Sequence, residues 1–134
     1  MPRKTDSHNP GDWLWIASSD LELIRIGAER EVSHAMCRSK LAEVLEKILK
    51  AELLRLGWRL VKTHDLRKLH GFLTDWNSSL AGPAQPLCES LQEVYFTDRY
   101  PGYDFEDPDW PAFRAEIAEV TALHAAVQSR LPAP

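Results

Sequence analysis

The sequence predicts an all-α protein, an up-and-down antiparallel four-helix bundle with one additional short helix. Apolar residues recur at steps of three and four through most of the chain, and no segment sustains an alternation of period two. The connections between the predicted helices are short, which favours antiparallel neighbours. With 134 residues, of which 44% are hydrophobic, the chain is long enough to bury one continuous core.

Two long helices are predicted in the first half of the chain. The first has an apolar stripe formed by Leu14, Ala17, Leu21, Ile24 and Ala28, and a turn follows near residues 31–33. The second covers residues 34–56, which contain no Gly or Pro, and its stripe is formed by Ala35, Ala42, Leu45, Leu49, Leu53 and Leu56, flanked by Leu41 and Ile48. Gly57 suits the left-handed position that follows a helix end.

Three further helices are predicted after Gly57. A short one has Thr63 as its N-cap, Asp65 in its first turn, and a stripe formed by Leu66, Leu69, Leu73 and Trp76. Residues 77–86 are predicted to form a loop because of Gly82, Pro83 and Pro86. The next helix holds Leu87, Leu91, Val94 and Tyr95, and it closes at or before Arg99 because Pro101 disfavours helical geometry at the residue before it. The last helix is capped by Asp107 or Asp109, with Phe113, Ile117, Val120, Leu123 and Val127 facing inward.

The chain is expected to form one domain over residues 12–131, with a flexible lead-in over 1–11 and a tail over 132–134. Because no segment resembles a signal peptide or a membrane span, we expect a cytoplasmic protein without membrane contact. Cys37 and Cys88 are expected to remain free thiols in that compartment. His34, Cys37, Cys88 and His124 lack the paired spacing of zinc ligands, so neither a metal nor a cofactor is expected.

Positive charge is concentrated in the middle of the chain. The net charge is −4, yet residues 38–68 hold nine Lys and Arg against four Asp and Glu. A ridge that faces phosphate could be built on the second helix and the turn after it by Lys40, Lys47, Lys50, Arg55, Arg59, Lys62, Arg67 and Lys68. A simpler interpretation is that the same residues are the solvated positions of an amphipathic helix.

Two further positions could carry chemistry. His64 and Asp65 stand at a predicted helix start, where backbone N–H groups attract anions, although Thr63 and Asp65 could simply cap that helix. Arg59 and His64 have the Arg-x4-His spacing that some metal-independent ribonucleases use, in which the Arg stabilises charge on phosphorus and the His moves a proton.

The region around Arg99 offers two readings as well. Arg99 could bind the last carbonyls of its helix or reach a carboxylate such as Glu46. The turn from Tyr100 to Tyr103 could stack a nucleobase or cover the end of the bundle.

Three stretches together resemble the HEPN domain family, found in prokaryotes and in some proteins of higher eukaryotes. They are residues 45–51 (LEKILKA), residues 63–66 (THDL) with Leu69, and residues 99–102 (RYPG), and they occur in the order and approximate spacing of the family. The resemblance implies a helical bundle, usually dimeric, that binds nucleotide or RNA and often works beside a small minimal nucleotidyltransferase. Several branches are ribonuclease toxins that this partner neutralises. Their Arg-x4-6-His motif begins a late helix, whereas Arg59 and His64 lie across a turn.

The leading hypothesis is therefore a dimeric module that binds a nucleotide or RNA phosphate and acts with a nucleotidyltransferase-type partner, as in toxin–antitoxin systems. Its expected ligand-binding residues are Glu46, Lys47, Lys50, His64, Asp65, Arg99 and Tyr100. One alternative is a metal-independent endoribonuclease toxin with Arg59 and His64 as its catalytic pair. Another is a non-catalytic protein-interaction module whose basic segment meets an acidic protein surface.

Overall fold

The computed structural model describes residues 7–92, 94 and 107–132, and this part of the chain is entirely helical apart from turns and irregular connections. Three helices are long, α1 (Pro10–Arg30), α2 (His34–Arg55) and α6 (Trp110–Arg130). Two are short, α3 (Leu66–Asp75) and α4 (Ala81–Leu91). The prediction of an all-α bundle is confirmed.

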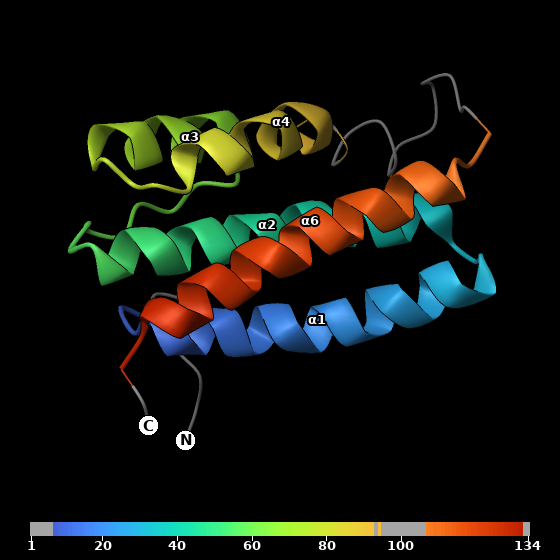
Figure 1. The fold of residues 1–134 in the computed structure, drawn as a ribbon, viewed down its shortest axis with the longest axis horizontal. Helices are drawn as coiled ribbons and strands as arrows, with labels where there is room; N and C mark the ends of the chain where they lie inside the picture. Colours follow the sequence, from blue (N-terminus) through green and yellow to red (C-terminus); the bar gives the residue numbers. More distant parts are fainter. Residues whose placement is uncertain (1–6, 93, 95–106, 133–134) are drawn as a thin grey trace.

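Helix α2 is the central element of the bundle. In Figure 1 it lies between α1 on one side and the α3–α4 pair on the other, while α6 crosses in front. The helix contacts all four of the other helices. This position explains why α2 buries residues all around its circumference, including Leu45, Leu49 and Leu53 of the predicted stripe. The antiparallel relation expected for neighbours is visible for α1 with α2 and for α3 with α4 (Figure 1).

The inward stripes predicted for the first and last helices are confirmed, since all ten of their residues are buried. Asp109 is the N-cap of α6, and its side chain accepts a hydrogen bond from the backbone N–H of Ala112. At the other end of the chain, α1 begins at Pro10, with Asn9 as its N-cap. The indole N–H of Trp13 donates to the carbonyl of Ser7, so residues 7–11 are part of the fold rather than of a lead-in.

A close approach of α1 to α2 depends on Gly27. A Cβ built at this position would lie 2.4 Å from Sγ of Cys37, which is far inside contact distance. The chain then reverses through Glu31 and Ser33, both of which have a positive φ of 54°. The turn predicted over residues 31–33 is therefore confirmed. It holds two non-glycine residues in the left-handed backbone conformation, which is strained when a Cβ is present.

The loop predicted over residues 77–86 is wrong in its second half, because α4 already begins at Ala81. Pro83 stands in the first turn of α4, where the backbone N–H groups need no partner within the helix. Pro86 does remove one helical hydrogen bond, but the carbonyl that loses its partner belongs to Gly82, which is exposed to water. Both prolines are therefore compatible with a helix of this length. The part of the fourth predicted helix beyond Gln92 falls, apart from Val94, outside the described residues.

Two predictions about the third helix are also corrected. Its N-cap is Asp65, whose Oδ1 accepts from the backbone N–H of Lys68, while the hydroxyl of Thr63 accepts from the N–H of Asp65. Trp76 follows the last turn of the helix and is 41% exposed, so it does not extend the buried stripe of Leu66, Leu69 and Leu73.

Candidate functional site

The segment between α2 and α3 returns along the bundle and brings His64 back to the middle of α2. Helix α2 closes at Arg55, and Gly57 takes the left-handed conformation expected for it, with a φ of 100°. Trp58 is buried and packs against Phe72, with ring centroids 5.5 Å apart. Figure 1 shows the connection running back beside α2 before α3 begins. His64 thereby reaches a residue eighteen positions earlier in the sequence, Glu46.

The carboxylate of Glu46 joins a buried ammonium group to an exposed imidazole. Its Oε1 lies 2.8 Å from Nδ1 of His64, and its Oε2 lies 2.9 Å from Nζ of Lys50. Glu46 is 7% exposed and Lys50 is 4% exposed, whereas the His64 side chain is 89% exposed. The Lys50 ammonium also lies 5.3 Å from the ring centre of Trp13, a cation–π arrangement.

This geometry fixes the protonation pattern of the imidazole. An ionised carboxylate only accepts hydrogen bonds, so Nδ1 of His64 must be the donor to Glu46. In neutral His64 the Nε2 atom then carries a lone pair that can take up a proton, and in the charged form Nε2 becomes a second donor. The pair can therefore bind an anion or transfer a proton at one exposed atom.

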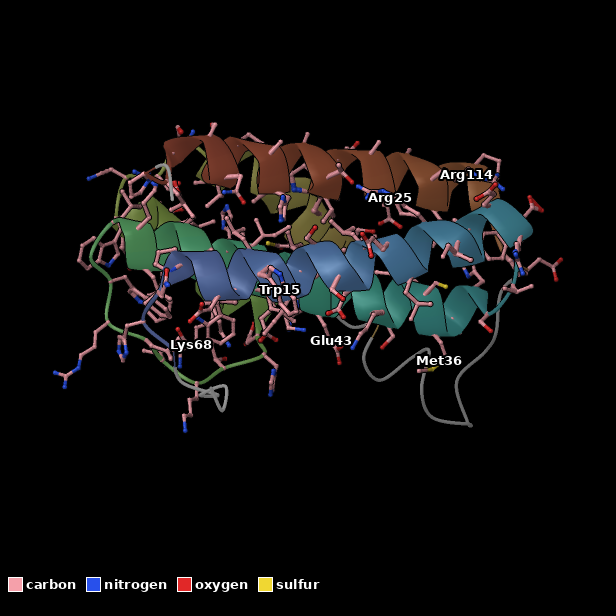
Figure 2. The ribbon with its side chains drawn as sticks, turned by 90° about the horizontal axis from the view of Figure 1, so that it is seen from below. Trp15, Arg25, Met36, Glu43, Lys68 and Arg114 are labelled. Carbon is pink, nitrogen blue, oxygen red and sulfur yellow. The ribbon has the colours of Figure 1, made fainter. Side chains whose placement is uncertain are left out.

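A cleft of about 360 Å³ lies beside this pair, a volume within the range of small-molecule sites. Its walls come from α2, from the start of α3 and from the end of α4, and they are formed by Ser39, Ala42, Glu43, Glu46, Lys47, His64, Leu66, Leu91 and Gln92. In Figure 2, Glu43 lies on the side of the bundle that faces away from α6.

The charged groups of the cleft are held by neighbours on the same chain. Nζ of Lys47 lies 2.9 Å from Asp20 of α1, and the carboxylate of Glu43 lies 2.9 Å from Nζ of Lys40. Because an ammonium group has three donors, Lys47 can keep its bond to Asp20 and still donate into the cleft.

Three of the predicted ligand-binding residues, Glu46, Lys47 and His64, line one cleft. Lys50 was expected to bind phosphate but is buried beneath the cleft with Glu46 as its partner, so it acts by holding the carboxylate. The carboxylate of Asp65 caps α3. Arg99 and Tyr100 lie outside the described residues.

The basic ridge considered along α2 is interrupted by ion pairs within the chain. Carboxylates of the same chain pair with Lys40, Lys47, Lys50, Arg55 and Arg67. Arg59, Lys62 and Lys68 are exposed and form no ion pair with any described residue. Of the cations considered for the ridge, those that are exposed and have no described ion-pair partner therefore lie in the return segment (residues 57–65) and at the start of α3. Within the described residues, no hydrogen bond links the Arg59 guanidinium to His64.

Sequence reasoning missed Asp20, Ser39 and Gln92. Gln92 follows α4, and its Oε1 accepts from the backbone N–H of Arg67, which ties the end of α4 to the start of α3. Asp20 reaches the site only through the packing of α1 on α2. Asp20 and Gln92 carry no local signal because they approach the cleft only through tertiary contacts, whereas Ser39 lies on the same face of α2 as Ala42, Glu43 and Glu46 and could have been found from helical spacing.

A second polar cluster lies near the C-terminal end of α2, around the fully buried Glu52. Its carboxylate accepts hydrogen bonds from Arg55, from the Ser78 hydroxyl at 2.7 Å and from Arg130 of α6 at 2.7 Å. Burial alone raises the pKa of Glu52, but the hydrogen bonds from Arg55 and Ser78 and the charges of Arg55 and Arg130 lower this pKa by more. The described partners of the carboxylate come from α2, α6 and the turn before α4, so the cluster joins elements of the bundle.

Comparison with known proteins assigns the chain to a family. A family model described as the HEPN domain matches residues 11–127, nearly the whole chain. The chain belongs to the HEPN family. HEPN membership agrees with the all-helical architecture and relates the chain to helical modules associated with nucleotides and RNA. Neither the curated proteins nor the solved structures include a significant match.

The described part of this HEPN domain shows neither a candidate membrane span nor a candidate metal site. None of the described helices combines the length and the apolar character that crossing a bilayer requires. Among residues 7–92, 94 and 107–132, no three His, Cys, Asp or Glu side chains gather as a group that could hold a metal ion.

Proposed function

We propose that this HEPN protein binds a nucleotide, or the phosphates of an RNA, at the α2 cleft. The observation that carries the proposal is the exposed imidazole of His64, held by the buried Glu46 carboxylate at a cleft of about 360 Å³. Charged His64 donates from Nε2, and Lys47 has donors left over from its bond to Asp20. A phosphate group can accept from both residues.

The test is a titration of the purified protein with labelled AMP, ATP and a short RNA at low salt, where phosphate contacts are strongest. We expect saturable binding that His64→Ala weakens by about tenfold or more, since a charge-assisted hydrogen bond is lost. His8→Ala is the matched control, because His8 is an exposed histidine that does not line the cleft. Absence of binding by all three probes at low salt contradicts the proposal.

The assembly in which the module works is also part of the proposal. It acts in the cytoplasm as a homodimer and with a nucleotidyltransferase-type protein partner, in a toxin–antitoxin-like pair, and membership in the HEPN family supports this assignment. Light scattering measures the dimer directly. Co-purification with a co-expressed nucleotidyltransferase, after nuclease treatment, tests for a protein contact without bridging RNA. A monomer that retains no such partner contradicts this part.

A second candidate function is that of a metal-independent endoribonuclease toxin, with Arg59 and His64 as catalytic residues. It is favoured by the Glu46–His64 contact, because an imidazole held at Nδ1 presents Nε2 as a base for a ribose hydroxyl. Expression should then arrest growth and yield cleaved RNA, and His64→Ala should abolish both effects. Unchanged arrest and cleavage in that variant would exclude this role for His64. A chain that binds a protein partner but no nucleotide or RNA is instead the interaction module considered above.

A further inference from the structure

The return segment lies along α3 from one end of that helix to the other. At its start, a Cβ placed on Gly57 would be 3.8 Å from the indole of Trp76, which follows the last turn of α3. At its end, Asp65 caps the first turn of α3. The segment and the helix are therefore antiparallel, with Trp76 near one end and His64 with its cleft at the other.

Exposed cations occupy the positions between these two ends. Arg59 and Lys62 form no ion pair with any described residue, in contrast to Lys40 and Lys47 on α2. Adjacent residues span at most about 3.6 Å, so Arg59 and His64 lie no more than about 18 Å apart along the chain. Lys68 adds a charge on α3, and Figure 2 places it, like Glu43 of the cleft, on the side of the bundle away from α6.

Trp76 gives this row of charges an aromatic end. The residue follows the last turn of α3 and is 41% exposed, so part of it is open to solvent. A flat aromatic face together with successive cations is the combination that binds single strands, because bases stack on the ring while the cations neutralise phosphates. An acidic protein surface could use the cations and pack on the indole as well, but a polynucleotide would also place a phosphate at the His64 cleft where the strip ends.

We infer that Trp76, Arg59 and Lys62 form a strip that continues the His64 cleft and binds a single-stranded RNA several nucleotides long, with a base on Trp76 and phosphates along the cations. This inference rests on the proposed function, because the strip ends at the phosphate site of the cleft. It assigns the protein a polynucleotide rather than a free mononucleotide as its ligand.

The experiment compares binding of a labelled uridine oligomer with binding of UMP, both measured over a series of salt concentrations. The double substitution Arg59→Gln/Lys62→Gln should reduce the slope of log K against log salt by about 1.4, which corresponds to two lost phosphate contacts on a single strand. Trp76→Leu keeps an apolar side chain against Gly57 but removes the stacking face, and it should weaken oligomer binding by about 5- to 100-fold. Trp76→Phe should retain most of that affinity. Neither Trp76 substitution should alter binding of UMP.

The matched controls are Arg30→Gln, an exposed cation at the end of α1, and Trp15→Leu, an exposed indole on α1, and both should leave oligomer binding unchanged. If UMP binds but the oligomer binds no tighter, or if the strip substitutions match these controls, the strip is refuted while the cleft stands. If neither probe binds at low salt, the proposed function fails as well. Equal binding of polyglutamate, insensitive to Trp76→Leu, would identify an acidic protein surface as the ligand and overturn the inference.

Discussion

Nδ1 of His64 lies 2.8 Å from Oε1 of Glu46, although eighteen positions separate the two residues in the sequence. The contact exists because the chain reverses after α2 and runs back beside it. It sets an exposed imidazole against a buried carboxylate that is itself neutralised by Lys50. The stability of the bundle and the chemistry of the cleft therefore share one side chain, Glu46.

Substitution of Glu46 should destabilise the protein strongly. In Glu46→Gln the buried Lys50 ammonium loses its counter-charge, and breaking a buried ion pair from one side costs about 3–5 kcal/mol. Denaturant unfolding measures the free energy of unfolding. The double substitution Glu46→Gln/Lys50→Met removes the orphaned charge and should recover much of the loss. A single substitution that costs under about 1 kcal/mol would show that water solvates Lys50 in the folded protein.

The free energy of unfolding should fall in acid because the Glu52 carboxylate becomes protonated. Because its pKa is lower in the folded protein than its ordinary value of 4.5, the carboxylate contributes stability that is complete above that value. The contribution is lost as the pH falls below 4.5 and through the lower folded-state pKa. The free energy of unfolding of Glu52→Gln should therefore depend less steeply on pH in this range than that of the wild type. Glu22→Gln, at an exposed position of α1, should keep the wild-type slope.

The two cysteine thiols should react more slowly than solvent-exposed thiols do. Burial, followed by the charge of Glu89, raises the pKa of Cys88 to about 12, and burial also raises the pKa of the less buried Cys37. In a Cys37→Ala variant, Cys88 should resist a thiol reagent at neutral pH until denaturant unfolds the protein. Rapid labelling of that variant in its native state would show that the core around α4 opens readily.

Gly27→Ala should destabilise the contact between α1 and α2. The added methyl group would meet Sγ of Cys37 at 2.4 Å, so the helices must move apart or the thiol must rotate away. We expect a loss of about 1–3 kcal/mol in the free energy of unfolding, as for other overpacked positions. Adding Cys37→Ala should relieve the clash, and a double-mutant cycle measures the coupling.

Gly71→Ala is the control for this prediction. A Cβ at Gly71 meets nothing within 4 Å, and the residue lies inside α3. The substitution should therefore stabilise the protein by about 0.5–1 kcal/mol through helix propensity. Opposite signs for the two substitutions would establish that packing, rather than backbone preference, decides the effect at Gly27.

The fold could be predicted from the sequence where apolar spacing reflects burial on one side of a helix. The stripes beginning at Leu14 and Phe113 are confirmed for this reason, as is the helix end at Gly57. Helix α4 was placed too late because prolines normally interrupt helices, and only the register shows Pro83 in a first turn.

The site was harder to predict because charge in a sequence does not reveal its partner. Lys50 stands outside the apolar stripe predicted for its helix, a position typical of solvent-exposed residues. The other four described helices cover α2, however, so Lys50 is buried together with Glu46. Glu46, Lys47 and His64 fall in the stretches that resemble the family, and the structure places them on one cleft. Asp20 and Gln92 carry no local signal, since they reach this region only when α1 and α4 pack.

The two walls of the cleft differ in how they are held. Helix α2 is bonded along its length and touched by every other described helix, whereas no amide of residues 59–64 donates to the backbone of another described residue. Amide hydrogens of that segment should therefore exchange with deuterium long before those of α2. Local opening of this segment would carry His64 away from Glu46 and widen the cleft for a larger ligand, while the interior of the bundle stays intact.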